Sequence, residues 1–223
     1  AVKVCCNFPE TASQLPADKA VLTGSPIRQE LLQGDAQKAL EFCGFGDRKP
    51  VILIIGGSLG AASINENIRK ILPQLLPDFQ IIHLCGNGKL DASLEQTEGY
   101  VQFEYIKKEL ADLFALADII VSRAGANAIC EILALQKPSL LIPLSAKASR
   151  GDQILNARSF EHQGFSIVLE EEAITEETLL SAIRDLYCHR ESYINTMKKN
   201  NTMDSITRIT NLFEEITSSH KSL

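Results

Sequence analysis

Short runs of almost purely apolar residues alternate along this chain with segments of helical periodicity, and this alternation most constrains the fold. The runs VILII at 51–55 and SLLI at 139–142 contain no charged residue. Strands that helices cover on both faces have such continuous apolar character, whereas half-exposed strands alternate apolar with polar residues. The order of the segments therefore predicts an α/β fold, an open parallel sheet with helices on both faces.

The expected strands share β-branched or apolar character and lie at Val2–Asn7, Ala20–Thr23, Val51–Ile55, Gln80–Leu84, Val101–Glu104, Ile119–Ser122, Ser139–Ile142 and Ser166–Leu169. The expected helices lie at Ile27–Phe42, Ala61–Leu72, Glu109–Leu116, Ala126–Leu135, Asp152–His162 and Glu176–Tyr187. Right-handed crossovers would bring the carboxyl ends of the strands to one edge of the sheet, where such sheets bind ligands.

The C-terminal part of the sequence departs from this alternation. From Asp185 to Leu223 it predicts only helix. The last helix carries an apolar stripe formed by Ile206, Ile209, Leu212, Phe213 and Ile216. The stripe has two interpretations: it covers the core of its own domain, or it packs on a neighbouring one.

Composition excludes several classes of protein. The chain has 22 Lys and Arg against 28 Asp and Glu, a net charge of −6, so we expect no sequence-independent nucleic-acid binding. No apolar run approaches the roughly 18 residues of a membrane-spanning helix. The six cysteines fit neither a zinc site nor a disulfide framework, and we expect reduced thiols. The four histidines show no metal-ligand spacing, and we interpret His83 as structural.

Two glycine-containing turns each join a predicted strand to a predicted helix. The first, I-G-G-S-L-G-A, ends at Ala61, and the second, S-R-A-G-A, ends at Ala126. Backbone N–H groups at a helix start can bind phosphate, although an ordinary tight turn explains either segment equally well. Glu131 follows in the second helix, as a surface charge or as an acceptor for the two hydroxyls of a ribose.

Two further segments carry side chains suited to a ligand. Arg28 follows Pro26 and is either solvated or directed at a phosphate as a planar fork. Asp152 and Gln153 begin a predicted helix, where they either cap it or contact sugar hydroxyls. From these residues alone both choices stay open.

Together the segments resemble one family. T-G-S-P-I-R, G-G-S-L-G-A, the block from Tyr105 to Glu131, P-S-L-L-I-P and D-Q-I-L-N-A occur in the order and spacing of the MurG-type undecaprenyl-diphospho-muramoylpentapeptide β-N-acetylglucosaminyltransferases. The resemblance covers about Lys19 to Thr178. It implies a glycosyltransferase-B fold of two Rossmann-like domains, of which this chain would be the C-terminal half that binds UDP-N-acetylglucosamine.

The resemblance implies a set of donor-binding positions: Arg28, Gly57, Ser58, Gly60, Ile106, Gly125, Ala126, Glu131 and Gln153, with Asp152 as a further sugar contact. Arg28 and the loop of Gly57, Ser58 and Gly60 would hold the diphosphate. The main chain of Ile106 would contact the uracil edge, and Gly125 and Ala126 would approach the diphosphate or the base. Glu131 would hold the ribose hydroxyls, and Gln153 would contact the N-acetylglucosamine. Asp152 replaces the His or Gln of other members, and Leu59 replaces their Gln.

The implied reaction is inverting transfer of N-acetylglucosamine to a lipid-linked muramoyl-pentapeptide in peptidoglycan synthesis, with no metal and no cofactor. The resemblance places the general base and the acceptor site in an N-terminal half, so no catalytic residue is assigned here and we expect donor binding with little or no transfer. It also implies a cytoplasmic enzyme, peripheral on the inner face of the cytoplasmic membrane.

Two alternatives stay open. The chain could be a stand-alone nucleotide-sugar-binding subunit that works with a separate acceptor-binding partner. It could also be a related epimerase or hydrolase, which would need an acid–base pair that this sequence does not display.

The expected organisation has three parts. Residues 1–18 would be a remnant of the N-terminal domain, 19–188 the donor-binding domain and 189–223 a helical tail. In the absence of the N-terminal half, we expect self-association through the last helix.

Overall fold

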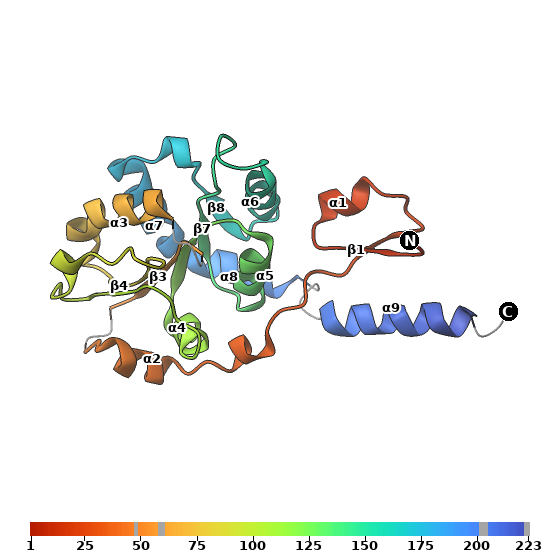
Figure 1. The fold of residues 1–223 in the computed structure, drawn as a ribbon, viewed down its shortest axis with the longest axis horizontal. Coiled ribbons are helices and arrows are strands. Elements are labelled where there is room, and N and C mark those ends of the chain that lie inside the picture. Colours follow the sequence, from red (N-terminus) through yellow and green to blue (C-terminus); the bar gives the residue numbers. More distant parts are fainter. Residues whose placement is uncertain (47–48, 58–60, 201–204, 221–223) are drawn as a thin grey trace.

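A six-stranded parallel sheet forms the centre of the larger part of the molecule (Figure 1). The computed structural model describes residues 1–46, 49–57, 61–200 and 205–220. The strands are β3 (Val51–Ile55), β4 (Gln80–Leu84), β5 (Tyr100–Phe103), β6 (Ile119–Ser122), β7 (Ser139–Leu141) and β8 (Ser166–Val168), in the spatial order β5-β4-β3-β6-β7-β8. The chain proceeds outward from β3 to β5 and then returns to β6. The carboxyl ends of β3 and β6 therefore flank a topological switch point, the usual ligand site of such sheets.

The central strands are buried on both faces, as their continuous apolar character predicts. β4 and β6 are buried along their whole length, and in β3 only Ile55 is partly exposed. Ile52 packs in one hydrophobic cluster and its neighbour Leu53 in another, on the opposite face. The predicted α/β class and the open parallel sheet are therefore confirmed.

Helices cover both faces of the sheet. α3 (Ala62–Leu75) and α7 (Glu176–Cys188) pack on the face that carries Ile52. α2 (Ala36–Cys43), α4 (Leu110–Leu116) and α5 (Ala126–Ala134) pack on the face that carries Leu53. α6 (Asp152–His162) and α8 (Arg190–Lys198) join α5 in a third cluster. This arrangement leaves the carboxyl edge of the strands to the loops.

The single helix predicted over Ile27–Phe42 is wrong, because the structure has a 3₁₀ turn at Gln29–Gln33 followed by the separate helix α2. A Cβ on Gly34, between the two, would stand 2.0 Å from the carbonyl oxygen of Ala111 in α4. Only glycine lets the chain pass this close to α4. Asp35 then caps α2, because its carboxylate accepts hydrogen bonds from two N–H groups of the first turn.

The helix predicted to stop at Leu72 instead continues through Pro73 to Leu75. A proline inside a helix removes one hydrogen bond and costs about 3 kcal/mol or more. Leu72 and Leu75 are both buried in the cluster beneath α3. Burial of Leu75, which lies beyond the proline, contributes roughly 1.5–3 kcal/mol and so offsets much of this cost.

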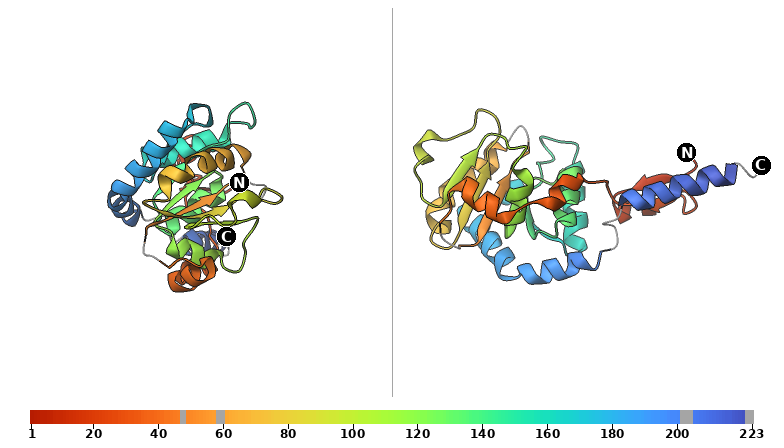
Figure 2. Two further views of the ribbon diagram at one scale, coloured as in Figure 1. Left: turned by 90° about the vertical axis from the view of Figure 1, so that its left-hand side faces the viewer. Right: turned by 90° about the horizontal axis from the view of Figure 1, so that it is seen from below.

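The first residues and the last helix form a smaller part beside the sheet domain (Figures 1 and 2). β1 (Val4–Cys6) pairs in parallel with β2 (Ala20–Leu22), and the short helix α1 (Pro9–Ser13) connects them. Both strands are shorter than predicted. In both figures α9 (Ser205–His220) lies along these two strands. The Arg208 guanidinium donates a hydrogen bond of 3.1 Å to the carbonyl oxygen of Leu22 in β2.

The apolar stripe of α9 is divided between two environments. Ile209, Leu212 and Ile216 are half-buried, whereas the side chains of Ile206 and Phe213 are 44% and 65% exposed. None of the five belongs to the hydrophobic clusters of the sheet domain. The helix therefore adds nothing to the core beneath the six-stranded sheet.

The smaller part is in contact with α6. The Ser159 hydroxyl donates a hydrogen bond of 2.7 Å to the carboxylate of Glu10 in α1. The rings of Phe8 and Phe160 pack edge to face, with centroids 6.2 Å apart.

All six cysteines are free thiols. Cys5 is exposed and its neighbour Cys6 is buried, as expected for adjacent residues of a strand. Burial raises the pKa of Cys43 and of Cys130 to about 11, so both stay protonated near neutral pH.

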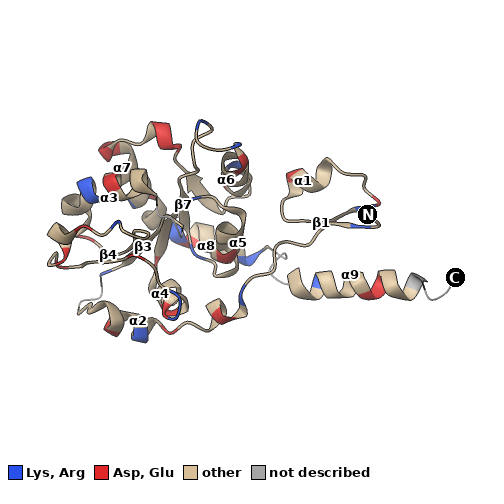
Figure 3. Ribbon diagram, in the orientation of Figure 1, with Lys and Arg blue, Asp and Glu red and all other residues tan. Residues whose placement is uncertain are grey.

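Charged residues are distributed over both parts of the molecule. Figure 3 shows lysines and arginines interspersed with aspartates and glutamates along the sheet domain and α9. Within the described ranges no helix has both the length and the apolar character needed to cross a membrane.

Candidate functional site

A cavity of about 580 Å³ opens at the switch point, at the carboxyl ends of β3, β4 and β6. We call it the edge pocket. Its wall includes Ile55, Leu84 and Ser122 from the strand ends, Glu104, Tyr105 and Ile106 from the loop after β5, and Asn127, Ala128 and Glu131 from α5. Arg28 and Gly57 also line the pocket, so four of the predicted donor-binding residues meet in one cavity.

Arg28 and Glu131, which are 103 residues apart in sequence, form a bidentate ion pair in this wall. Arg28 Nε and Nη2 donate hydrogen bonds of 2.9 and 3.1 Å to the two carboxylate oxygens of Glu131. The bond to Glu131 raises the pKa of Arg28 above its ordinary value. The Arg28 side chain is 55% exposed and that of Glu131 is 16% exposed. The two groups predicted to bind the diphosphate and the ribose of a nucleotide thus contact each other in this structure.

Gly57 forms the turn after β3 with a φ of +84°, a conformation that residues with a side chain rarely adopt. A Cβ there would meet nothing within 4 Å, so the backbone conformation rather than crowding requires glycine. Ser58 and Gly60, predicted to act with it, and Leu59 between them lie outside the described residues.

The N-terminus of α5 provides backbone donors next to the pocket. Gly125 is the N-cap residue, and no side chain caps the helix there. A Cβ on Gly125 would meet nothing within 4 Å, so the space before Ala126 is open to a ligand. Uncapped N–H groups and the helix dipole favour an anion at such a position.

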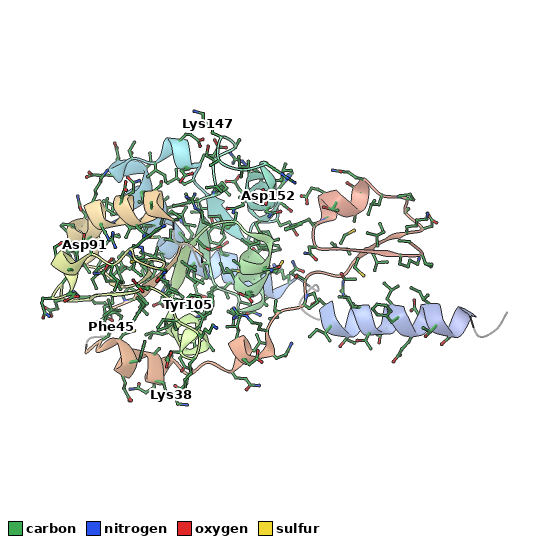
Figure 4. All side chains as sticks on the ribbon, viewed as in Figure 1. Lys38, Phe45, Asp91, Tyr105, Lys147 and Asp152 are labelled. Atoms are coloured by element: carbon green, nitrogen blue, oxygen red, sulfur yellow. The ribbon has the colours of Figure 1, made fainter. Side chains whose placement is uncertain are left out.

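Gln153 and Asp152 lie outside the edge pocket, at the start of α6. The Gln153 side-chain oxygen accepts a hydrogen bond of 3.1 Å from the N–H of Leu144, in the loop between β7 and α6. Asp152 lines a separate hollow of about 340 Å³ with α1. Figure 4 shows Asp152 well apart from Tyr105 of the edge pocket. The predicted sugar contacts therefore sit one strand further along the carboxyl edge.

Tyr105 is a pocket residue that the sequence analysis did not single out. Its ring is 57% exposed, although it forms part of the wall, and the Lys107 ammonium lies 5.8 Å from the ring centroid. Its position next to Ile106, within the block that carries the resemblance, was the only signal in the sequence.

His83 is structural, as predicted, and lies within the sheet rather than in the pocket. It is fully buried, with one ring nitrogen 2.9 Å from the Tyr100 hydroxyl and the other 2.9 Å from the side-chain oxygen of Asn65. Burial, together with the charge of Arg69, lowers the pKa of His83 to about 3, so the ring is neutral.

Among the residues that the structure describes, no three His, Cys, Asp or Glu side chains lie close enough together to hold a metal ion. Among the described residues, Arg28 and the start of α5 bring positive charge to the edge pocket.

A sequence profile of the glycosyltransferase family 28 C-terminal domain matches residues 51–213, which include all six strands of the large sheet. This chain belongs to that family. This chain is 60% identical over 215 residues to the UDP-N-acetylglucosamine–N-acetylmuramyl-(pentapeptide) pyrophosphoryl-undecaprenol N-acetylglucosamine transferase of Lachnospira eligens. That match covers 96% of this chain and 61% of the relative.

Solved structures share the fold of this family 28 domain. MurG of Acinetobacter baumannii superposes with a TM-score of 0.72 at 24% identity, over 96% of this chain and 60% of that one. The glycosyltransferase of kitacinnamycin superposes with a TM-score of 0.73 at 19% identity, over 96% of this chain and 54% of that one. The predicted glycosyltransferase-B type of Rossmann-like domain is therefore confirmed.

Proposed function

We propose that this chain is the donor-binding half of an N-acetylglucosaminyltransferase, which transfers N-acetylglucosamine from UDP-N-acetylglucosamine to a lipid-linked muramoyl-pentapeptide in peptidoglycan synthesis. The observation that carries the proposal is the edge pocket, where Arg28, Gly57, Ile106 and Glu131 meet at the switch point of the sheet. The name of the Lachnospira eligens relative supports this choice of donor and acceptor.

The pocket suggests how the donor would lie. The uracil would contact the main chain of Ile106, and the ribose hydroxyls would bind Glu131. Arg28 would leave Glu131 for the diphosphate. Since an ion pair with a half-exposed partner contributes only about 0–1 kcal/mol, this exchange of partners costs little. The sugar would then extend along the edge towards Gln153.

The chemistry follows from where charge develops. In inverting transfer, a hydroxyl of the acceptor sugar attacks the anomeric carbon of the donor sugar. The bond between this carbon and the oxygen of UDP breaks at the same time. Arg28 and the backbone N–H groups at Gly125 and Ala126 would stabilise the negative diphosphate as it leaves, without a metal ion. The chain spans 61% of its relative's length. We place the general base and the acceptor site in the remaining part, and the complete enzyme at the inner face of the cytoplasmic membrane.

Calorimetric titration of the full chain with UDP, UDP-N-acetylglucosamine and UDP-glucose tests the donor site. We expect all three to bind through the shared UDP, with UDP-N-acetylglucosamine binding more tightly than UDP-glucose. If none of the three releases or absorbs heat on mixing at several temperatures, the chain has no donor site and the proposal is wrong.

A further inference from the structure

A second arginine lies at the carboxyl edge of the sheet without contributing to the edge pocket. Arg123 directly follows Ser122, the last residue of β6, and precedes the start of α5. Ser122 and α5 line the edge pocket, but Arg123 does not. Its side chain is only 12% exposed. It belongs to the S-R-A-G-A segment, yet the proposed donor contacts give it no role.

The Arg123 guanidinium is directed at the loop between β7 and α6. Nη1 donates hydrogen bonds of 3.2 and 3.1 Å to the carbonyl oxygens of Ile142 and Pro143, and Nη2 donates one of 2.5 Å to Glu171. A planar guanidinium holds three such acceptors in fixed directions, which a lysine ammonium does not reproduce. Arg123 therefore ties the end of β6 to the chain that leaves β7.

Glu171 completes the arrangement from the other side of the loop. Its second carboxylate oxygen accepts a hydrogen bond of 3.2 Å from the N–H of Ser145, while the next residue, Glu172, accepts one from the Ser145 hydroxyl. The side chain of Glu171 is 17% exposed. Burial acts to raise the pKa of Glu171, but the hydrogen bonds from Arg123 and the Ser145 N–H outweigh it and hold that pKa below its usual range. The loop between β7 and α6 is thus held in place by hydrogen bonds to Arg123 and Glu171, and this charged pair stays ionised.

This loop in turn fixes the position of the Gln153 side chain. Leu144, between the residues held by Arg123 and by Glu171, donates its N–H to the Gln153 side-chain oxygen. With that oxygen engaged, the amide nitrogen of Gln153 is the group left to reach a ligand. Its position depends on Leu144, and the position of Leu144 depends on the two charged side chains.

We propose that Arg123 and Glu171 are positioning residues for recognition of the donor's sugar: they fix residues 142–145, and through Leu144 they set the place of Gln153. The inference rests on the proposed function, because it takes the nucleotide to lie in the edge pocket and the sugar beside α6. It separates the roles of the two arginines at the edge. Arg28 exchanges partners when the diphosphate arrives, whereas Arg123 keeps its partners throughout.

The test uses Arg123→Lys and Glu171→Gln in the full chain, with Arg158→Lys as the matched control. Arg158 also pairs with two glutamates, Glu161 and Glu170, but on an exposed face of α6 and without contact to the loop. Calorimetry with UDP, UDP-N-acetylglucosamine and UDP-glucose measures each variant. We expect both test variants to bind UDP within about twofold of the unsubstituted chain but UDP-N-acetylglucosamine about tenfold less tightly, the scale of one or two hydrogen bonds.

The pattern of affinities decides between the outcomes. Equal losses of affinity for UDP and UDP-N-acetylglucosamine would mean that Arg123 and Glu171 only support the structure of the domain. Unchanged affinities would mean that the two residues do not position the sugar site. Either result overturns the inference and leaves the proposed function standing. If the unsubstituted chain binds UDP in no titration, the proposed function fails and the inference falls with it.

Hydrogen exchange supplies a readout that needs no ligand. The N–H groups of Leu144 and Ser145 are the donors to Gln153 and Glu171, so their exchange reports directly on the loop. In both test variants we expect faster exchange for the segment 142–149, with other segments unchanged, and no acceleration in Arg158→Lys. Exchange in this segment at the unsubstituted rate would overturn the inference, even if a variant had a lower melting temperature.

Discussion

The two arginines at the carboxyl edge differ chiefly in burial, and burial decides what each can do. The Arg28–Glu131 pair, half-exposed on the arginine side, contributes about 0–1 kcal/mol and is easily exchanged. The Arg123–Glu171 pair is largely buried on both sides. Removing one member of a buried pair costs about 3–5 kcal/mol, because the other charge is left without a partner. The same residue type is therefore suited to a ligand at one position and to a scaffold at the other.

Substitutions at Glu131 and at Arg28 should weaken the binding of different parts of the nucleotide. We expect Glu131→Ala to weaken the binding of uridine and of UDP alike by about 1.5–3 kcal/mol, because it removes charged hydrogen bonds to the ribose. Glu30→Ala, near Arg28 but outside the pocket wall, should change neither and serves as the control. Calorimetry of Glu131→Ala and Glu30→Ala with uridine and UDP checks this. An unchanged UDP affinity in Glu131→Ala would leave Glu131 only its pair with Arg28.

Arg28→Ala should weaken the binding of UDP but not that of uridine, because only UDP carries the diphosphate that Arg28 is proposed to bind. Uridine affinity should stay the same or rise up to about fivefold, since Glu131 is then free of its ion pair. The same titrations measure it. A parallel loss of uridine and UDP affinity would contradict a phosphate-specific role.

His83 should make the stability of the domain depend on pH. The pKa of His83 is about 3 in the folded chain and that of an ordinary histidine is 6.5, so the unfolded chain binds the extra proton between these values. Stability is full above pH 6.5 and declines as the pH falls, by up to about 1.4 kcal/mol per pH unit from this residue. Urea unfolding at pH 7.5, 6 and 5 measures how steeply the free energy of unfolding changes with pH. A His83→Gln variant should show a shallower slope, and identical slopes would contradict the assignment.

At the scale of elements, packing between helices overrides the local pattern in two places. Apolar periodicity favours one helix over 27–42, but the approach of Gly34 to Ala111 in α4 breaks it. The proline after Leu72 predicts a helix end, but burial of Leu75 extends α3 past it. In both cases the deciding contact comes from an element distant in sequence.

Gly34→Ala should therefore destabilise the domain. The new Cβ would overlap the Ala111 carbonyl, and overpacking of this kind costs about 1–3 kcal/mol. The matched control is Gly46→Ala, because a Cβ at Gly46 meets nothing within 4 Å. Urea unfolding of the two variants gives the comparison. Equal stability of Gly34→Ala and Gly46→Ala would show that α4 shifts without cost.

At the scale of the whole molecule, the chain consists of a sheet domain with its own core and a smaller part of β1, α1, β2 and α9 (Figure 2). The smaller part has only two strands and few buried residues. Two-stranded sheets are marginally stable by themselves. The exposed Ile206 and Phe213 in α9 add apolar surface to this part.

We expect the isolated chain to self-associate through α9. Light scattering after size exclusion should give a molar mass that rises above the 24.5 kDa of the monomer as concentration increases. Phe213→Glu should restore the monomer, because it places a charge in the apolar surface. Asn211→Glu adds the same charge at another exposed position of α9 and should not. A constant monomeric mass for the unsubstituted chain would contradict this prediction.

Much of the fold was predictable because burial leaves a periodic trace in the sequence. The apolar runs VILII and SLLI correspond to β3 and β7, and the α/β order follows from them. The proposed site was predictable in part, since glycine turns and the start of α5 mark the carboxyl edge. Tyr105 was missed because a lone aromatic next to a strand carries no distinguishing pattern.

By itself, the sequence determined the class of the fold, the edge at which a ligand would bind and most of the strands, because each of these depends on neighbours within a few residues. Only the tertiary structure decided that Arg28 pairs with Glu131, that Arg123 is turned towards Glu171, and that α9 lies along β1 and β2. These outcomes join residues far apart in the chain. They are set by which surfaces meet and by how much water each charge retains, and no local pattern records either quantity.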